Sequence, residues 1–210
     1  MRSASLLHPP QPRYSTTFDM EHVYDFIAHT WHDHVNISLT DLTRKTAFLL
    51  AARAIMRSSD LARISSSSVS FQRASVSFVV KQPKESSVRE PHRLVMLSCT
   101  QPDASCAVCS LLAYYSRTRA WRFKVGDRDH LFVSCDNTFR PVSSQRIAKW
   151  LTSVLHDAGI DTSIYKAHSI RSASATLQRD QGVSVDEIMA KAHWRSRSVF
   201  TRYYDRSTTT

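Results

Sequence analysis

The sequence has no long apolar run and no apolar leader. Nowhere do about 18 or more apolar residues follow one another, which is the length that a membrane-spanning helix needs. The segment from Met1 to Arg13 is polar and rich in proline, and it lacks the apolar core of a secretory signal. We therefore expect neither a membrane span nor export by a signal peptide.

Cysteine is scarce as well, with four residues at positions 99, 106, 109 and 135. So small a number fits reduced thiols in an intracellular protein. Cys106 and Cys109 have the C-x-x-C spacing of half a zinc site, but a second pair is missing and Cys99 and Cys135 stand alone. Because a free cysteine is usually just buried, we expect structural cysteines and no metal site.

Acidic residues are outnumbered by basic ones. The chain has 18 Asp and Glu against 28 Lys and Arg, which gives a formal net charge of +10. That surplus favours a polyanionic partner, most commonly nucleic acid, and the alternative is a basic protein without such a partner. A length of 210 residues fits one domain, or one domain with an arm, and a hydrophobic content of 42% is enough for a real core.

The apolar pattern predicts an α+β chain that is mainly helical and packs around a small antiparallel sheet. Residues 1–16 are polar and proline-rich, so we expect a flexible arm there and a single domain over 17–210. Helices are predicted from residue 18 through Trp31, from Ser38 or Thr40 to about Arg57, and over 107–115, 144–155, 168–179, 184–192 and 198–204. Strands are predicted at 69–71, 76–80 and 94–97, with 81–93 as a hairpin tip and at most a short strand at 131–133. Gly159 and Gly182 are expected to end helices, and low complexity is limited to 65–68 and the threonine tail.

The last third of the chain carries a motif with fixed spacing. His168 and Arg171 form an H-x-x-R motif, Trp194 follows 26 positions after the histidine (168 to 194), and Tyr203 follows nine further on (194 to 203). A lone H-x-x-R occurs in many helices by chance, but the complete spacing is much rarer. Together with an arginine far upstream, these residues are what covalent cleavage of a phosphodiester needs.

The chemistry explains the choice of residue types. Positive charge must neutralise the non-bridging oxygens as the phosphorane forms, and arginine grips two oxygens without losing its charge. A nucleophile must attack in line, which suits tyrosine because its phosphodiester conserves the bond energy for rejoining. An acid must protonate the departing oxygen, which suits a lysine on a mobile hairpin.

Over about residues 40–206 the sequence resembles the catalytic domain of the tyrosine recombinase, or phage integrase, family. Arg57, in Met-Arg-Ser-Ser-Asp-Leu after a predicted helix, resembles the first family arginine, with Asp60 as its supporting acidic residue. The resemblance makes Arg171 the second arginine and His168 the residue that assists proton transfer at the tyrosine.

The resemblance also assigns Trp194 and Tyr203. Trp194 stands where the family has a histidine or tryptophan that donates a hydrogen bond to a non-bridging oxygen, and Tyr203 matches the nucleophile. Tyr204 is the adjacent rival for the nucleophile, and His193 is the rival for the hydrogen-bond donor. A nine-residue step from His193 reaches Arg202, which cannot be a nucleophile, so the pairing of Trp194 with Tyr203 is preferred. Trp194 as plain core packing is the alternative.

In this family the general-acid lysine lies on the second hairpin. Lys81, at 24 residues after Arg57 (57 to 81), fits an ungapped register, and Lys84 is the close alternative. The basic residues near the nucleophile are expected to face DNA phosphates or to form a merely solvated basic face: Arg195, Arg197 and Arg202.

The resemblance implies a DNA breaking-rejoining core that recombines or integrates DNA at specific sites through a 3′-phosphotyrosine intermediate. It implies double-stranded DNA as the partner, a homo-oligomer on DNA, and no cofactor, metal, membrane or small-molecule substrate. The wording around Arg57, Arg171 and Tyr203 is most similar to the recombinases of DIRS-type retrotransposons and cryptons, which implies a transposable element and the nucleus. Too few residues precede the pattern for the usual N-terminal clamp domain, which we expect to be absent or truncated. The rival functions are a type IB topoisomerase-like enzyme and a non-catalytic DNA-binding module derived from a recombinase.

Overall fold

The computed structural model describes residues 16–83, 92–100, 102–122, 129–136, 138–194, 196–203 and 206–208, and for residues 122, 199, 202 and 203 the backbone only. The expected arm at 1–16 lies, apart from Thr16, outside the described residues. The helices are α1 (Met20–Thr30), α2 (Leu39–Arg53), α3 (Ser58–Leu61), the 3-10 turn η2 (Ser66–Ser68), α4 (Ala107–Arg122), α5 (Ser144–Asp157), α6 (Ser169–Asp180), α7 (Val185–Ala192) and α8 (Arg197–Tyr203). The strands are β1 (Thr16–Thr17), β2 (Ser70–Gln72), β3 (Ser75–Lys81), β4 (His92–Ser98) and β5 (Ser207–Thr208).

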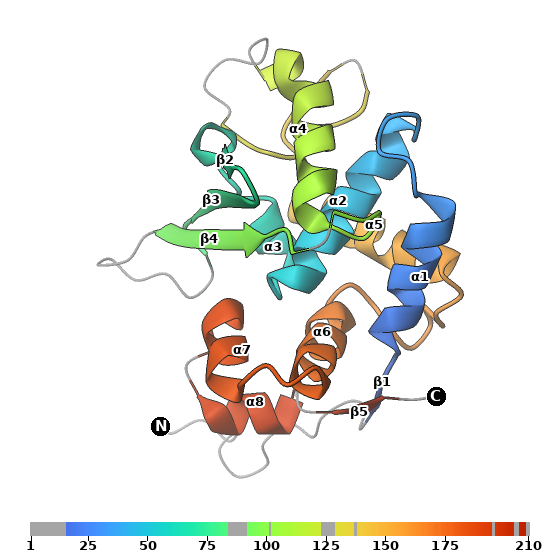
Figure 1. Ribbon diagram of the computed structural model, residues 1–210, viewed down its shortest axis with the longest axis vertical. Helices are drawn as coiled ribbons and strands as arrows, with labels where there is room; N and C mark the ends of the chain where they lie inside the picture. The colour runs from blue at the N-terminus through green and yellow to red at the C-terminus, as the bar shows by residue number, and fades with distance from the viewer. Residues whose placement is uncertain are drawn as a thin grey trace, which may run out of the picture.

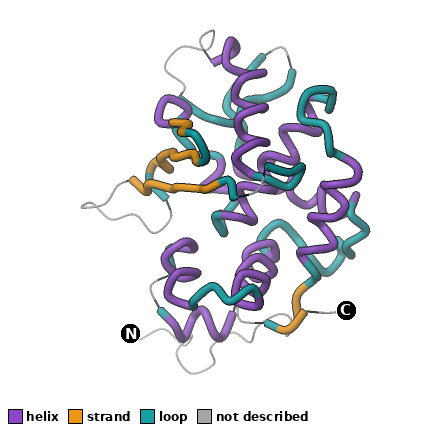
Figure 2. The backbone as a smooth tube through the Cα atoms, viewed as in Figure 1, coloured by secondary structure: helices purple, strands orange, loops and turns teal. Residues whose placement is uncertain are grey.

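The expected fold class is confirmed, because helices dominate and the three strands β2, β3 and β4 form an antiparallel sheet in that order. Figure 1 shows the sheet beside α4 and α2, with α6, α7 and α8 gathered below them. The trace in Figure 2 shows the same division, with the sheet at one edge and helices through the rest. None of the described helices is both long enough and apolar enough to cross a bilayer.

Helix α2 is the centre of the core. Its N-cap Ser38 accepts a hydrogen bond from the backbone N–H of Asp41 (3.1 Å), which satisfies one of the donors left over at a helix start. Nearly every residue from Leu42 to Ala52 is buried, because α4, α5 and α6 pack around the helix. A helix that is buried on all sides gives a rigid support for the chain that follows it.

The end of α2 differs from the prediction. The helix was expected to reach about Arg57, but it ends at Arg53. Ile55 then adopts a positive φ of 49°, which a β-branched residue rarely does, and its side chain is fully buried. Burial of Ile55 among the residues of α6, α7 and α8 offsets the backbone strain. The chain therefore turns, and Arg57 stands before a new short helix, α3.

The sheet has one covered and one open face. Along β3 the residues Val76, Phe78 and Val80 are buried and their neighbours are more exposed, which is the alternation of a half-buried strand. On β4 the side chains of Leu94 and Met96 are exposed. Lys81 pairs with His92 at the end of the sheet that leads into the hairpin. The three predicted strands are confirmed: β3 and β4 are longer than expected, and β2 has the expected length but begins one residue later. The segment at 131–133 forms only an isolated bridge between Val133 and Pro141.

The C-terminal helices follow their local signals. Gly159 and Gly182 have φ values of +78° and +84° just after α5 and α6, as expected of C-terminal glycines. A pairing that the sequence did not indicate joins the two ends of the domain, because β1 and β5 run parallel, with Thr16 opposite Ser207 and Thr17 opposite Thr208. Both strands contact α6, so the segment after α8 is fixed against the body of the domain.

Candidate active site

A buried carboxylate organises the turn that carries Arg57. Asp60, on α3, is fully buried, and its Oδ2 accepts a hydrogen bond from the backbone N–H of Arg57 (3.0 Å). Helix α3 in turn packs on α2, α5 and β3, so the turn cannot shift without disturbing the core. Asp60 therefore fixes the backbone from which the half-buried Arg57 side chain projects.

Arg171 reaches the same carboxylate from another part of the chain. It lies on α6, is 3% exposed, and places Nη1 at 3.9 Å from Oδ2 of Asp60. Its Nη2 donates a hydrogen bond to the carbonyl oxygen of Ala192 at the end of α7 (3.0 Å). The guanidinium carbon also lies 5.1 Å from the ring centroid of Trp194, in cation–π range. Contacts with α3, α7 and Trp194 thus hold one buried cation in place.

Trp194 follows directly on a sharp turn. His193 has a φ of 55° and ends α7, after which the backbone N–H of Trp194 donates to the carbonyl oxygen of Met189 (2.9 Å). The indole is 8% exposed and packs against Phe200 of α8, with ring centroids 5.6 Å apart. Trp194 therefore packs in a small apolar cluster and also contacts Arg171. His193, the rival, is exposed.

His168 stands at the start of α6 and lines a shallow cleft. Its carbonyl oxygen accepts a hydrogen bond from the backbone N–H of Arg171 (3.3 Å), and its side chain is exposed. Ser58, the neighbour of Arg57, lines the same cleft as His168, and so do Lys149, His156 and Lys166. The start of α3 and the start of α6 are thereby joined by a surface that carries several basic side chains.

Lys81 lies at the end of β3 and is paired with a carboxylate. Its Nζ is 2.8 Å from Oδ2 of Asp129, and the lysine side chain is 46% exposed. Burial would raise the pKa of Asp129, but hydrogen bonds from Lys81 and from Ser65, Ser66 and Ser67 hold that pKa well below its usual range. Three residues of the serine run, Ser65, Ser66 and Ser67, thus bind a carboxylate. The rival Lys84 lies outside the described residues.

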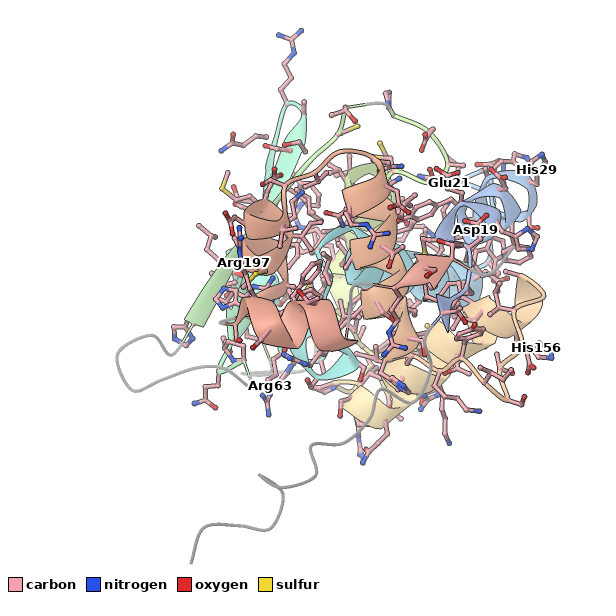
Figure 3. The ribbon with its side chains drawn as sticks, turned by 90° about the horizontal axis from the view of Figure 1, so that it is seen from below. Asp19, Glu21, His29, Arg63, His156 and Arg197 are labelled. Carbon is pink, nitrogen blue, oxygen red and sulfur yellow. The ribbon has the colours of Figure 1, made fainter. Side chains whose placement is uncertain are left out.

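The expected nucleophile lies at the end of α8, and only some of the residues around it belong to the described part of the chain. Tyr203 is the last residue of α8, and its side chain is not described, nor is that of Arg202. Arg195 and Tyr204 lie outside the described residues. Arg197 is exposed and forms an ion pair with Asp186 of α7 (2.8 Å). Figure 3 shows Arg197 and Arg63 on one side of the molecule, with Asp19, His29 and His156 on the other.

The structure thus brings Asp60 together with Arg57, Arg171 and Trp194, although α3 and α6 are far apart in the sequence. Lys81 is held at the edge of the sheet by Asp129, a residue that sequence reasoning missed. Only its position just before the predicted short strand at 131–133 could have drawn notice to Asp129, because its partners lie in a distant turn.

Residues 18–210 match the model of the phage integrase family, and the chain belongs to this family. Its fold is similar to that of the XerH site-specific recombinase bound to difH substrate (TM-score 0.66, 14% identity, covering 90% of this chain and 49% of that one). It is also similar to XerA recombinase (TM-score 0.65, 18% identity, 98% and 64%) and to the Tn1549 transposon integrase in complex with circular intermediate DNA (TM-score 0.58, 10% identity, 99% and 66%). The chain spans about half to two thirds of the length of these proteins. No curated protein matches its sequence.

Proposed function

We propose that this chain cleaves and rejoins double-stranded DNA at specific sites through a 3′-phosphotyrosine intermediate, in DNA integration or transposition. The observation that carries the proposal is the buried arrangement in which Asp60 fixes the Arg57 turn and lies 3.9 Å from Arg171. Asp60, the carbonyl oxygen of Ala192 and the Trp194 ring hold Arg171 in place, and two arginines on fixed backbone can grip the non-bridging oxygens of a scissile phosphate. Family membership and the net charge of +10 support the same conclusion.

In the proposed reaction Arg57, Arg171 and the indole N–H of Trp194 hold the non-bridging oxygens of the scissile phosphate. The Tyr203 oxygen attacks phosphorus and His168 assists removal of the phenolic proton, so that a phosphotyrosyl bond forms at the 3′ side. The bond from phosphorus to the 5′-oxygen breaks, and Lys81 or Lys84 gives that oxygen a proton. A 5′-hydroxyl from a second DNA end then attacks the phosphotyrosine and releases Tyr203.

We propose that the DNA partner contacts the cleft beside His168. Lys149 and Lys166 are exposed there, and His156 adds a third basic group. The neighbouring Arg57 turn and the start of α6 place this cleft next to the arginine pair. A homo-oligomer on DNA is part of the proposal, and the lambda integrase tetramer bound to a Holliday junction has a similar fold.

We also propose that the chain comes from a eukaryotic mobile element of the DIRS or crypton type and acts in the nucleus. The residues that flank Arg57, Arg171 and Tyr203 in the sequence support this assignment. Sequencing the genomic flanks would test it, because a mobile element should be bounded by repeats that recur at other loci. A single-copy locus without such repeats would contradict it.

The test of the chemistry is a suicide-substrate assay. Nicked duplexes drawn from the flanking repeats or a random pool are incubated with the protein in EDTA and resolved on a denaturing gel. A covalent protein–DNA adduct is expected from the wild type and from Tyr204→Phe, and none from Tyr203→Phe. An adduct lost only in Tyr204→Phe would move the nucleophile by one residue. DNA binding without any adduct would favour the non-catalytic module instead.

The topoisomerase alternative predicts a different product. A type IB topoisomerase-like enzyme rejoins the same strand, so it would relax a supercoiled plasmid that contains no target site. A recombinase is expected to leave such a plasmid supercoiled and to exchange ends only between target duplexes. Both measurements use the same protein preparation.

A further inference from the structure

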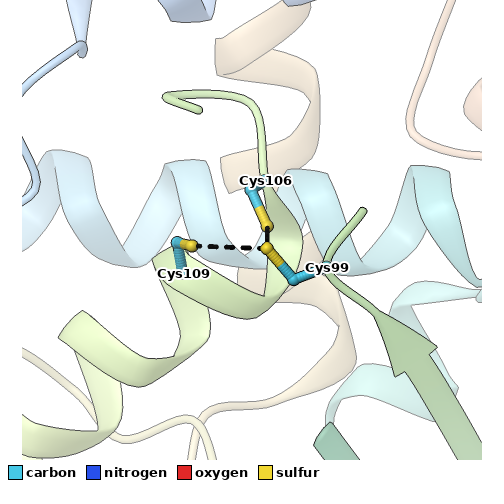
Figure 4. Close-up of side chains that lie close together, drawn as sticks. All are labelled: Cys99, Cys106 and Cys109. Atoms are coloured by element: carbon cyan, nitrogen blue, oxygen red, sulfur yellow. Dashed lines mark hydrogen bonds between the residues drawn. The ribbon is translucent and has the colours of Figure 1, made fainter. Parts of the chain in front are cut away.

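Three of the cysteine thiols converge at one end of the sheet. Cys99 follows β4, Cys106 precedes α4, and Cys109 lies in the first turn of α4. The Sγ atoms of Cys99 and Cys106 are 3.3 Å apart, those of Cys99 and Cys109 are 3.9 Å apart, and all three lie within 4.8 Å of one another (Figure 4). The expectation that Cys99 stands alone is wrong, because the chain leaving β4 returns to the start of α4.

The spacing of the sulfur atoms suits a tetrahedral metal ion. A zinc–sulfur distance of about 2.3 Å in a tetrahedral site places two thiolate sulfurs about 3.8 Å apart. The distances of 3.3 and 3.9 Å lie on either side of that value. A disulfide needs sulfurs about 2.05 Å apart, so one pair would have to move closer and leave the third thiol behind. The convergence of three thiols on one point therefore fits a metal better than a disulfide.

Helix α4 supplies two of the three thiols, because Cys106 and Cys109 stand at the N-terminal end of this helix of 16 residues. Burial and the neighbouring thiols raise the pKa of Cys109 to about 12, and a hydrogen bond with Cys106 raises the pKa of Cys99, so a binding cation has to displace their protons. The N–H of Cys106 already donates to the carbonyl oxygen of Asp103 (3.2 Å), which fixes the approach of the chain to the helix. Two of the ligands are thus held by one element.

The cluster borders an open cavity through Cys106. Cys106 lines this cavity together with Ser98, Thr100 and Asp103. Among the residues that the structure describes, no histidine or carboxylate joins the three thiols within ligand distance. A metal ion would reach the site through the cavity, and a water molecule would complete its coordination.

We propose that Cys99, Cys106 and Cys109 bind one thiophilic divalent cation of the Zn²⁺ type, with water as the fourth ligand. On binding, the three thiols release their protons to solvent and form three metal–sulfur bonds. The bound ion fastens the end of β4 to the start of α4. The site lies at the opposite end of the sheet from Lys81, so it is separate from the phosphodiester chemistry.

The test is metal titration of the reduced full chain, with Cys135→Ser as the matched control. Cys135 is half-buried and lies outside the cluster, beside Thr43. Wild type and Cys135→Ser should each bind one equivalent of Zn²⁺, and Co²⁺ should give the intense near-ultraviolet absorption of cobalt thiolates. Cys99→Ser should bind Zn²⁺ at least about ten times more weakly. Binding by Cys99→Ser that equals wild type, or no binding by reduced wild type, would overturn the proposal.

A second measurement needs no variant and so does not depend on how well a variant folds. Reduced wild-type protein is alkylated with and without Zn²⁺, and each cysteine is followed by mass spectrometry. Zinc should slow alkylation of Cys99, Cys106 and Cys109 together by about tenfold or more and leave Cys135 unchanged. Equal protection of all four cysteines, or of none, would contradict the site. A Cys99–Cys106 disulfide in air, with no zinc protection after reduction, would replace it with a redox pair.

Discussion

Replacing Asp60 by asparagine tests whether the buried carboxylate holds the site together. The substitution keeps the shape and an oxygen that can accept from the Arg57 backbone N–H, but it removes the negative charge 3.9 Å from Arg171. Both side chains are buried, at 3% and 0% exposure, so solvent cannot replace the lost partner. Removing one member of a buried ion pair costs about 3–5 kcal/mol, and the long separation favours the lower end.

The expected loss is large enough to measure by thermal unfolding. For a domain of this size, about 3 kcal/mol lowers Tm by roughly 6–12 °C. Asp186→Asn is the matched control, because Asp186 forms an exposed ion pair with Arg197 in which both side chains are mostly exposed. That control should change Tm by less than about 2 °C. Calorimetry on the two variants decides the question, and equal small shifts would refute the structural role of Asp60.

Further predictions concern pH and salt. Lys45 lies on α2, and burial lowers its pKa to about 8, below its ordinary value. The unfolded chain therefore binds this proton more tightly than the folded chain, and the free energy of unfolding should rise between about pH 8 and 10. Lys45→Met should abolish that rise in urea unfolding, and parallel curves for both proteins would contradict it. The pKa of Asp129 is lowered despite its burial, because Lys81 and the serines donate hydrogen bonds to the carboxylate. The ionised carboxylate therefore stabilises the folded chain above about pH 4, and this contribution is lost as pH falls through the lowered pKa. Asp129→Asn should therefore lower stability at pH 7 and make the acid loss shallower. Changing Lys149 and Lys166 together to glutamine should weaken DNA binding. The slope of log K against log salt concentration should fall by about 0.9 for each phosphate that the variant no longer neutralises, measured by fluorescence anisotropy between about 50 and 200 mM salt. An unchanged slope would place the DNA elsewhere.

The sequence predicted best those elements whose ends carry local signals. Ser143 and Ser184 cap α5 and α7 with side-chain hydrogen bonds, and Gly159 and Gly182 follow α5 and α6, so these boundaries came within a residue or two. The end of α2 was missed because nothing local announces that Ile55 adopts a positive φ. Its conformation is fixed by burial against α6, α7 and α8, which are remote in the sequence.

The candidate site divides in the same way. Motif spacing singled out Arg171 and Trp194, and the family resemblance singled out Arg57. The structure places Arg171 and Trp194 in direct contact and Arg57 on the turn fixed by Asp60. Spacing could not find Asp129 beside Lys81 or Cys99 beside Cys106. Each contact joins the end of a strand to another segment, and only the folded structure shows that the two lie side by side. The roles of Tyr203, Lys81 and the basic residues near α8 stay predictions.

The short parallel pairing of β1 with β5 brings the first and the last strand of the domain side by side. Thr16 lies opposite Ser207 and Thr17 opposite Thr208, so the start of β1 and the end of β5 stand at the two ends of a parallel ladder that is only two residues long. Helix α8 is therefore anchored at both ends, by α7 on one side and by a clasp to the first residues of the domain on the other. A new peptide linker between the two ends, with the chain opened at an exposed loop, should yield a circular permutant that still folds. In the native connectivity, a mechanical force applied to either terminus would act on the β1–β5 pairing before it reached Arg57 and Arg171.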